Sequence, residues 1–124
     1  MSPPTTGREW VVEAFGCDSG ALADPARLEA LFDRLVRDLD LNPVGDALWH
    51  VFPPPGGITG LWLLAESHLT CHTFPEHGSL CLNLFCCTPR PDWDYASGLA
   101  EFFEAERVEV RRLPRAYASF ARPS

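Results

Sequence analysis

The stretch ITGLWLLAESHLTCHTF, residues 58–74, decides how the chain folds. Its first part, up to Ser67, is apolar and rich in strand-forming residues, and LTCHTF (residues 69–74) has the composition of a second strand. We therefore predict two consecutive strands joined tightly around Ser67 and His68. A third strand, SLCLNLFCC (residues 79–87), follows a four-residue connection.

Two helices are predicted outside this stretch. Asp24-Pro25 supplies an acidic N-cap and a proline in the first turn. Asp92 is the predicted cap of the second helix. The residues expected to face inward from the two helices are Leu28, Leu31, Phe32, Leu35, Val36 and Leu39, and then Trp93, Leu99, Phe102 and Phe103.

Further strands are expected over residues 8–17, 46–52 and 107–113, which gives the order β-α-β-β-β-β-α-β. This order predicts an α+β fold, a two-layer sandwich of a mostly antiparallel sheet with two helices on one face. A length of 124 residues is typical of a single domain, residues 1–124.

The composition narrows the possible partners. The net charge of −7 argues against nucleic acid or an anionic membrane as the main partner, because both require a basic surface. The sequence has no apolar run of membrane-spanning length and no signal-peptide pattern at its start, so we expect a cytoplasmic protein.

The five cysteines are odd in number and show no C-x-x-C pair, so a disulfide scaffold or zinc site is not expected. We interpret most of them as small buried apolar residues. Cys86 and Cys87 are adjacent in a predicted strand and should point to opposite faces.

The segment LLAESHLTCHTFPEHGS (residues 63–79) carries the chemistry, and three interpretations of it are open. A Ser-His-acid hydrolase has its parts here, but the G-x-S-x-G context is missing. A metal site is disfavoured because a straight strand separates His68 from His72 by about 13 Å. The third interpretation is a polar hairpin at a sheet edge.

The same segment resembles the bacterial, short-chain S-adenosylmethionine decarboxylase proenzymes. That family has an A-E-S-H-[LI]-[ST]-x-H-T-[WF]-P-E-x-G pattern and a catalytic cysteine twenty residues after the serine, which here is Cys87. GREWVVEAFGCD near the start and HVFPPPGGITG before the motif are also similar to the family, so the resemblance covers roughly residues 7–113.

The resemblance implies self-cleavage between Glu66 and Ser67, which would divide the chain into residues 1–66 (β chain) and 67–124 (α chain). Ser67 would become a covalent pyruvoyl group that binds the substrate amine as a Schiff base. His72 would be the proton acceptor in processing, Thr59 would support it where the family has a serine, and Cys87 would be the proton donor in turnover.

For substrate binding, the resemblance implies that Phe52 stacks on the adenine and Glu76 holds a ribose hydroxyl or the sulfonium. The alternatives from the residues are core packing for Phe52 and a solvated turn acid for Glu76. No metal is implied. The implied assembly is a homodimer of processed protomers, and the implied product is the aminopropyl donor for spermidine biosynthesis.

Departures from the family near the expected pocket keep other functions open. The proline-glycine loop is one residue longer, Asn83 replaces a common aspartate, and Thr88-Pro89 replaces a glycine. One alternative is a pyruvoyl-dependent ornithine or arginine decarboxylase. Another is a non-catalytic relative that regulates a partner decarboxylase.

Overall fold

The computed structural model describes residues 6–118 of the chain. The elements within that range are, in order, β1 (Thr6–Phe15), α1 (Ser19–Leu22), α2 (Pro25–Asp38), β2 (Leu48–Val51), β3 (Ile58–Leu64), β4 (Ser67–Phe74), the short 3-10 helix η1 (Pro75–His77), β5 (Ser79–Cys86), α3 (Tyr95–Phe103) and β6 (Arg107–Ala116).

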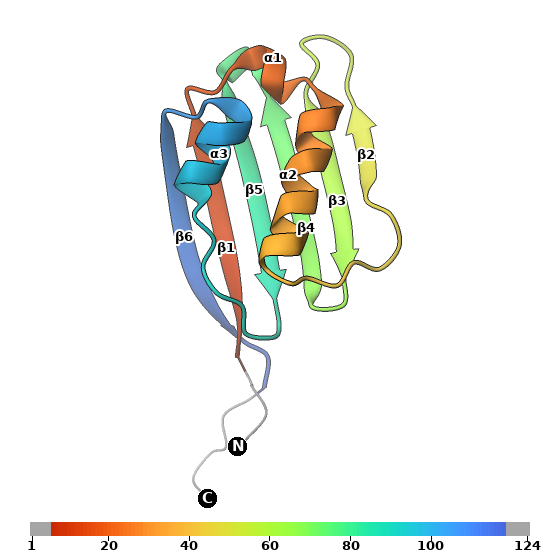
Figure 1. Ribbon diagram of the computed structural model, residues 1–124, viewed down its shortest axis with the longest axis vertical. Coiled ribbons are helices and arrows are strands. Elements are labelled where there is room, and N and C mark those ends of the chain that lie inside the picture. The colour runs from red at the N-terminus through yellow and green to blue at the C-terminus, as the bar shows by residue number, and fades with distance from the viewer. Residues whose placement is uncertain (1–5, 119–124) are drawn as a thin grey trace, which may run out of the picture.

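The strands form one six-stranded sheet in the order β2-β3-β4-β5-β1-β6, and every neighbouring pair is antiparallel. Both longer helices, α2 and α3, cover the same face of this sheet (Figure 1). The predicted α+β sandwich is therefore confirmed. The opposite face of the sheet, which we call the open face, carries no helix in the described residues.

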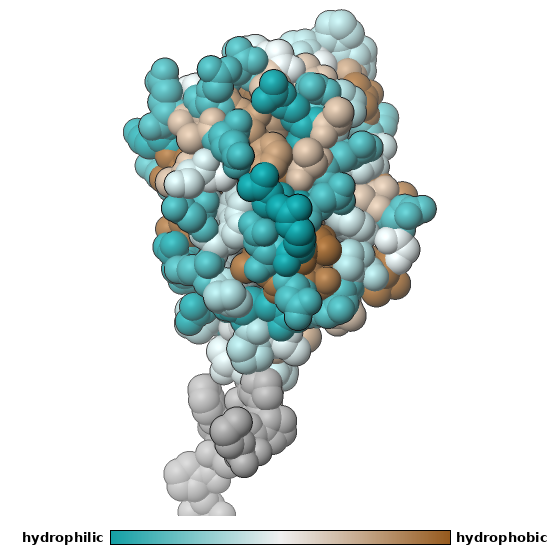
Figure 2. Space-filling model, in the orientation of Figure 1, coloured by the Kyte–Doolittle hydropathy of each residue, from teal (hydrophilic) through white to brown (hydrophobic). Residues whose placement is uncertain are grey.

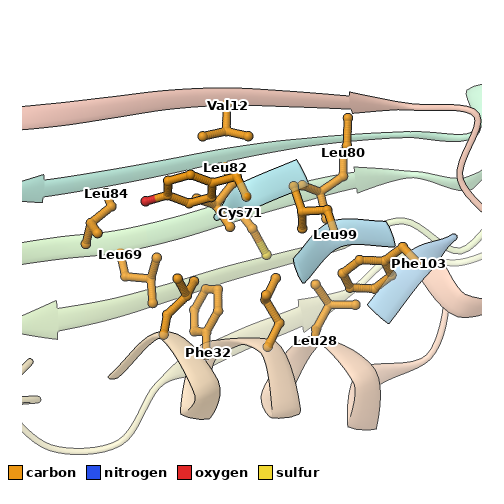
Figure 3. Packing of buried hydrophobic residues seen from close by; sticks show 14 of the residues in the cluster. Val12, Leu28, Phe32, Leu69, Cys71, Leu80, Leu82, Leu84, Leu99 and Phe103 are labelled. Carbon is orange, nitrogen blue, oxygen red and sulfur yellow. The ribbon is translucent and has the colours of Figure 1, made fainter. Parts of the chain in front are cut away.

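The core lies between the helix layer and the sheet, as Figure 3 shows. Alternation along the strands places Leu69 and Cys71 of β4 on the helix side, together with Leu82 of β5. Helix α2 contributes Leu28 and Phe32 from its apolar stripe. All five side chains are at most 2% exposed, so the central strands and α2 are held together by burial of apolar surface.

Helix α2 begins where the sequence predicts it. The Asp24 carboxylate accepts a hydrogen bond from the backbone N–H of Ala26, and Pro25 occupies the first turn. Arg37 lies in the last turn, where a cation is favourable next to the unpaired carbonyls.

Several boundaries differ from the prediction: β1 spans Thr6–Phe15 where residues 8–17 were expected, and β2 spans Leu48–Val51 where residues 46–52 were expected. Asp94, and not Asp92, caps α3, because its carboxylate accepts from the backbone N–H of Ser97. Asp92 instead accepts from the indole of Trp10 and from Arg112. The short helix α1 was not expected, and β6 continues past Leu113 to Ala116 through pairing with β1.

The outer surface of the helix layer is largely hydrophilic (Figure 2). Among residues 6–118, no helix is both long enough and apolar enough to cross a bilayer.

Candidate active site

Ser67 is the first residue of β4 and follows a two-residue turn formed by Ala65 and Glu66. Leu64 and Ser67 are direct partners across the turn, and the Ala65 N–H donates to the carbonyl of Asn42 at 2.7 Å. The tight strand connection is therefore confirmed. Its turn lies before Ser67, and the expected position around Ser67 and His68 was wrong because His68 already pairs with Leu63.

The backbone around this turn connects Glu66 to the end of β5. The Cys87 N–H donates to the carbonyl oxygen of Glu66 at 2.9 Å. Ser67 pairs in register with Cys86. The peptide between Glu66 and Ser67 is thus held against residues 86–87, at the end of the sheet where the β3–β4 turn and the end of β5 lie together (Figure 1).

Glu66 is only 4% exposed although its side chain is charged. Its carboxylate accepts from the backbone N–H and the side-chain amide of Asn42, and from the Arg90 guanidinium at 3.1 Å. Burial alone raises the pKa of Glu66, but the hydrogen bonds from Asn42 and the charge of Arg90 outweigh it, so the pKa lies below its ordinary value.

The two adjacent cysteines have different environments. Cys86 is fully buried, and burial raises the pKa of its thiol to about 11. Cys87 is partly exposed. The prediction that Cys86 packs in the core is therefore confirmed, and Cys87 is the thiol that solvent or a ligand can reach beside Glu66.

A second group of polar side chains lies farther along β3 and β4. Thr59 and His72 are direct partners, and Thr59 Oγ1 lies 3.0 Å from His72 Nδ1. Ser67 and His72 are five residues apart on the same strand, so their Cα atoms are separated by about 16 Å. The structure therefore groups the predicted site residues into two clusters, one at Glu66, Ser67 and Cys87 and one at Thr59 and His72.

A groove of about 290 Å³ adjoins the second cluster. Phe52 is 48% exposed there and its ring contacts His50 edge-on, with 4.4 Å between ring centroids. Core packing of Phe52, the alternative suggested by the sequence, is thus excluded. Glu76 is an exposed residue of η1. The full lining is Phe52, Pro53, Pro55, Gly57, Thr59, His72, Thr73, Phe74 and Glu76.

His68 belongs to a different polar network on the open face. Its Nε2 lies 2.8 Å from Asn83 Oδ1, and the Asn83 amide donates to Glu9 at 2.7 Å. Glu9 also pairs with Arg115. The amide of Asn83 is the main cause that lowers the pKa of Glu9. Because Asn83 donates its amide to Glu9, its carbonyl oxygen faces His68 and the proton of this hydrogen bond belongs to His68 Nε2.

The sequence did not predict three residues around the first cluster. Asn42 and Arg90 bind the Glu66 carboxylate from the segment after α2 and from the loop after β5, and the Asp40 carbonyl accepts from Arg90. Their separations from Glu66 are too long for a local spacing rule to detect. Among residues 6–118, no group of three or more His, Cys, Asp or Glu side chains is arranged to hold a metal ion.

Comparison with known proteins gives the family of this fold and site. A family model described as S-adenosylmethionine decarboxylase matches residues 8–116. S-adenosylmethionine decarboxylase proenzyme 2 of Halalkalibacterium halodurans is 38% identical over 112 residues, which are 90% of this chain and 87% of the relative. The proenzyme of Pyrococcus furiosus is 34% identical over 116 residues, which are 90% of this chain and 79% of that relative.

The crystal structure of the adenosylmethionine decarboxylase from Aquifex aeolicus superposes with a TM-score of 0.75. It covers 97% of this chain and 98% of its own, at 22% sequence identity, and so supports the fold. The chain is thus a two-layer α+β protein of decarboxylase architecture. It belongs to the S-adenosylmethionine decarboxylase family, whose relatives are named as proenzymes.

Proposed function

We propose that the chain is a self-processing, pyruvoyl-dependent S-adenosylmethionine decarboxylase. The observation that carries this proposal is the Glu66–Ser67 peptide, whose carbonyl accepts the Cys87 N–H at a tight turn, in a chain of this family. The relatives' names favour this substrate over ornithine or arginine, and no contact in the described residues favours either amino acid or a non-catalytic role.

In the proposed cleavage, Ser67 Oγ adds to the carbonyl carbon of Glu66. The negative charge that develops on the carbonyl oxygen is stabilised by the Cys87 N–H already bonded to it. The C–N bond then breaks, the hydroxyl proton passes to the departing nitrogen, and Glu66 is joined to Ser67 by an ester.

A base completes the cleavage by removing the α-proton of Ser67. Elimination releases residues 1–66, which now end in the main-chain carboxylate of Glu66, and hydrolysis of the remaining dehydroalanine with loss of ammonia leaves a pyruvoyl group at position 67. This group supplies an electron sink for decarboxylation of a bound amino acid. Cys87, partly exposed beside residue 67, is the proposed proton donor.

Intact mass spectrometry of the purified protein tests the cleavage. We expect fragments of 66 and 58 residues, the second with a blocked N-terminus (124 − 66 = 58). A chain that stays whole after long incubation would contradict the proposal, and a Ser67→Ala chain is the uncleaved control.

His72 is the proposed base, supported by Thr59, but it is about 16 Å from Ser67 along β4. We therefore propose a homodimer in which His72 of a second copy reaches Ser67. The open face carries exposed apolar side chains, Leu61, Leu63 and Phe74, that a second copy would cover.

Coexpression of two inactive chains tests this sharing. A Ser67→Ala chain retains His72, and a His72→Ala chain retains Ser67, so each should stay whole when it is made alone. We expect the His72→Ala chain to be cut only when the two are made together. If it stays whole in the mixed dimer, the two chains do not share the site.

The groove beside Thr59 and His72 is the proposed binding site of the adenosyl group. Phe52 offers an exposed aromatic face for the base, and Glu76 offers a carboxylate for a ribose hydroxyl or the sulfonium. The product would be the aminopropyl donor for spermidine. We place the enzyme in the cytoplasm, the location predicted from the sequence.

Release of carbon dioxide from S-adenosylmethionine, ornithine and arginine, measured separately, tests the substrate. We expect release from S-adenosylmethionine alone and a strongly reduced rate in Cys87→Ala. Release from ornithine or arginine alone would overturn the substrate and leave the cleavage proposal intact.

A further inference from the structure

Arg90 connects three segments of the chain at the cleavage turn. Its Nη1 donates to the Thr88 hydroxyl at 3.0 Å and to the Pro89 carbonyl at 2.8 Å. Its Nη2 donates to the Asp40 carbonyl at 3.1 Å and to the Glu66 carboxylate at 3.1 Å. The guanidinium thus joins the loop after β5, the segment that follows α2 and the turn before Ser67.

Asn42 donates to the same carboxylate from its backbone and from its side chain. Its backbone N–H donates to Oε1 of Glu66, and its side-chain amide and Arg90 both donate to Oε2. Both carboxylate oxygens of a residue that is only 4% exposed therefore accept hydrogen bonds. Charge-assisted hydrogen bonds of this kind restrict the side chain to one orientation.

The carbonyl of the same residue is held by a separate bond. The Cys87 N–H donates to Glu66 O at 2.9 Å, and Cys87 stands only three positions before Arg90. The loop that donates to the carbonyl is therefore the loop that binds the carboxylate. Removing the cation would leave a buried carboxylate without its charged partner, which favours turning Glu66 toward water and moving its carbonyl away from Cys87.

We propose that Arg90 is a positioning residue for self-cleavage, which acts through the Glu66 carboxylate to keep the Glu66 carbonyl on the Cys87 N–H. The inference rests on the proposed function. It assigns Arg90 to the first step alone, in which Ser67 Oγ forms a bond to the Glu66 carbonyl carbon and the C–N bond breaks. Arg90 has no part in removal of the α-proton.

The two steps leave different chemical signatures. A chain that lacks the base but completes the first step accumulates the ester, and hydroxylamine cuts an ester to give a hydroxamate at Glu66 and a free Ser67 N-terminus. A chain impaired in the first step remains an amide, which hydroxylamine leaves intact. The amount of hydroxylamine-cleavable chain therefore measures the step assigned to Arg90.

The experiment follows cleavage of the full chain over time after synthesis, by intact mass. We expect Arg90→Gln to slow cleavage about 10- to 100-fold and Arg90→Lys, which keeps the charge, to slow it less. Arg34→Gln, which breaks the distant pair with Glu101, is the matched control and should cleave at the native rate. In a His72→Ala background, Arg90→Gln should reduce the hydroxylamine-cleavable fraction.

A double-mutant cycle separates positioning from a general structural effect. If Arg90 acts through the Glu66 carboxylate, adding Arg90→Gln to a Glu66→Gln chain should lower its cleavage rate only slightly. If Arg90→Gln does not fold, as judged by circular dichroism, Asn42→Ala is the alternative variant, because it removes the amide that donates to the same Glu66 carboxylate. It should also lower the hydroxylamine-cleavable fraction in the His72→Ala background.

Native-rate cleavage in a folded Arg90→Gln chain, or rate losses that multiply in the double variant, would overturn the inference. Failure of the unmodified chain to cleave would instead overturn the proposed function, so the two failures are distinguishable.

Discussion

Thr59 Oγ1 lies 3.0 Å from His72 Nδ1 across the β3–β4 pair. Either group can donate in this contact, and the role of base proposed for His72 requires the hydroxyl to accept the Nδ1 proton, which leaves a lone pair on Nε2. That nitrogen is then available to take a proton. The hydroxyl at position 59 therefore orients His72 for the role of base that we propose for it.

Thr59→Val removes this hydroxyl and keeps the side-chain shape. Loss of one orienting hydrogen bond, worth about 1 kcal/mol, should slow cleavage about five- to tenfold. Thr59→Ser keeps the hydroxyl and should cleave close to the native rate. Intact mass measured over time gives both rates, and equal rates for the valine and serine variants would contradict the assigned orientation.

The close contact of Gly60 with Trp49 leads to a prediction about stability. A Cβ at Gly60 would lie 2.2 Å from the Trp49 ring, which packs on Phe32 with 4.7 Å between ring centroids. Gly60→Ala should therefore lower the free energy of unfolding by about 1–3 kcal/mol. The measurement is urea unfolding of an uncleaved Ser67→Ala chain at fixed concentration.

Trp49→Leu provides the control for this clash, because leucine leaves room for the added methyl group. In the Trp49→Leu background, Gly60→Ala should cost clearly less than it does alone. An equal cost in both backgrounds would mean that the alanine strains something other than the Trp49 ring.

The order of elements along the chain and the helix layer were predictable because each follows from local patterns, whereas the order of strands within the sheet was not predicted. Strand alternation and the Asp24-Pro25 helix start were sufficient to predict the sandwich. The boundaries that failed depend on distant partners. The Asp92 carboxylate accepts hydrogen bonds from Trp10 and Arg112, and Asp94 caps the helix instead. Strand β6 extends past its predicted end because it pairs with β1.

The site was predictable in its residue types and only partly in its arrangement. The roles of Ser67, His72 and Cys87 stay predictions from the family resemblance, and the register pairs Thr59 with His72. The Glu66 contacts were not predictable, since Asn42 and Arg90 each lie 24 residues away along the chain. Only the tertiary fold brings such residues together.

Two buried cysteines should resist alkylation in the folded protein. Burial raises the pKa of Cys71 from 9.0 to about 12 and that of Cys86 to about 11. The thiolate is the reactive form, so at pH 8 Cys86 should react at least about 100-fold more slowly than an unperturbed thiol. Peptide mass spectrometry after a short iodoacetamide pulse measures this.

The same pulse in concentrated urea is the control, and it should label both cysteines. Rapid labelling of Cys86 in the folded protein would show that the thiol next to Cys87 is reachable, against the packing described above.

The pH dependence of stability should report the contact between Glu66 and Arg90. The pKa of Glu66 lies below its ordinary value of 4.5, so the folded state favours the ionised carboxylate. Such a group contributes stability at pH values above 4.5, and that contribution is lost as the pH falls through the lowered pKa of the folded state. Glu66→Gln cannot ionise and leaves Arg90 without its charged partner.

Unfolding free energies of uncleaved Ser67→Ala and Ser67→Ala/Glu66→Gln chains, measured between pH 3 and pH 7, test this expectation. At neutral pH the free energy of unfolding of the Ser67→Ala chain, which keeps Glu66, should exceed that of the Ser67→Ala/Glu66→Gln chain by about 3 kcal/mol. This difference is the cost of breaking a buried ion pair. The difference should stay constant down to about pH 5 and then shrink steadily in more acidic solution. A difference that grows toward low pH would mean that the folded protein favours the protonated carboxyl, and the ion pair with Arg90 would then not be what holds Glu66 at the turn.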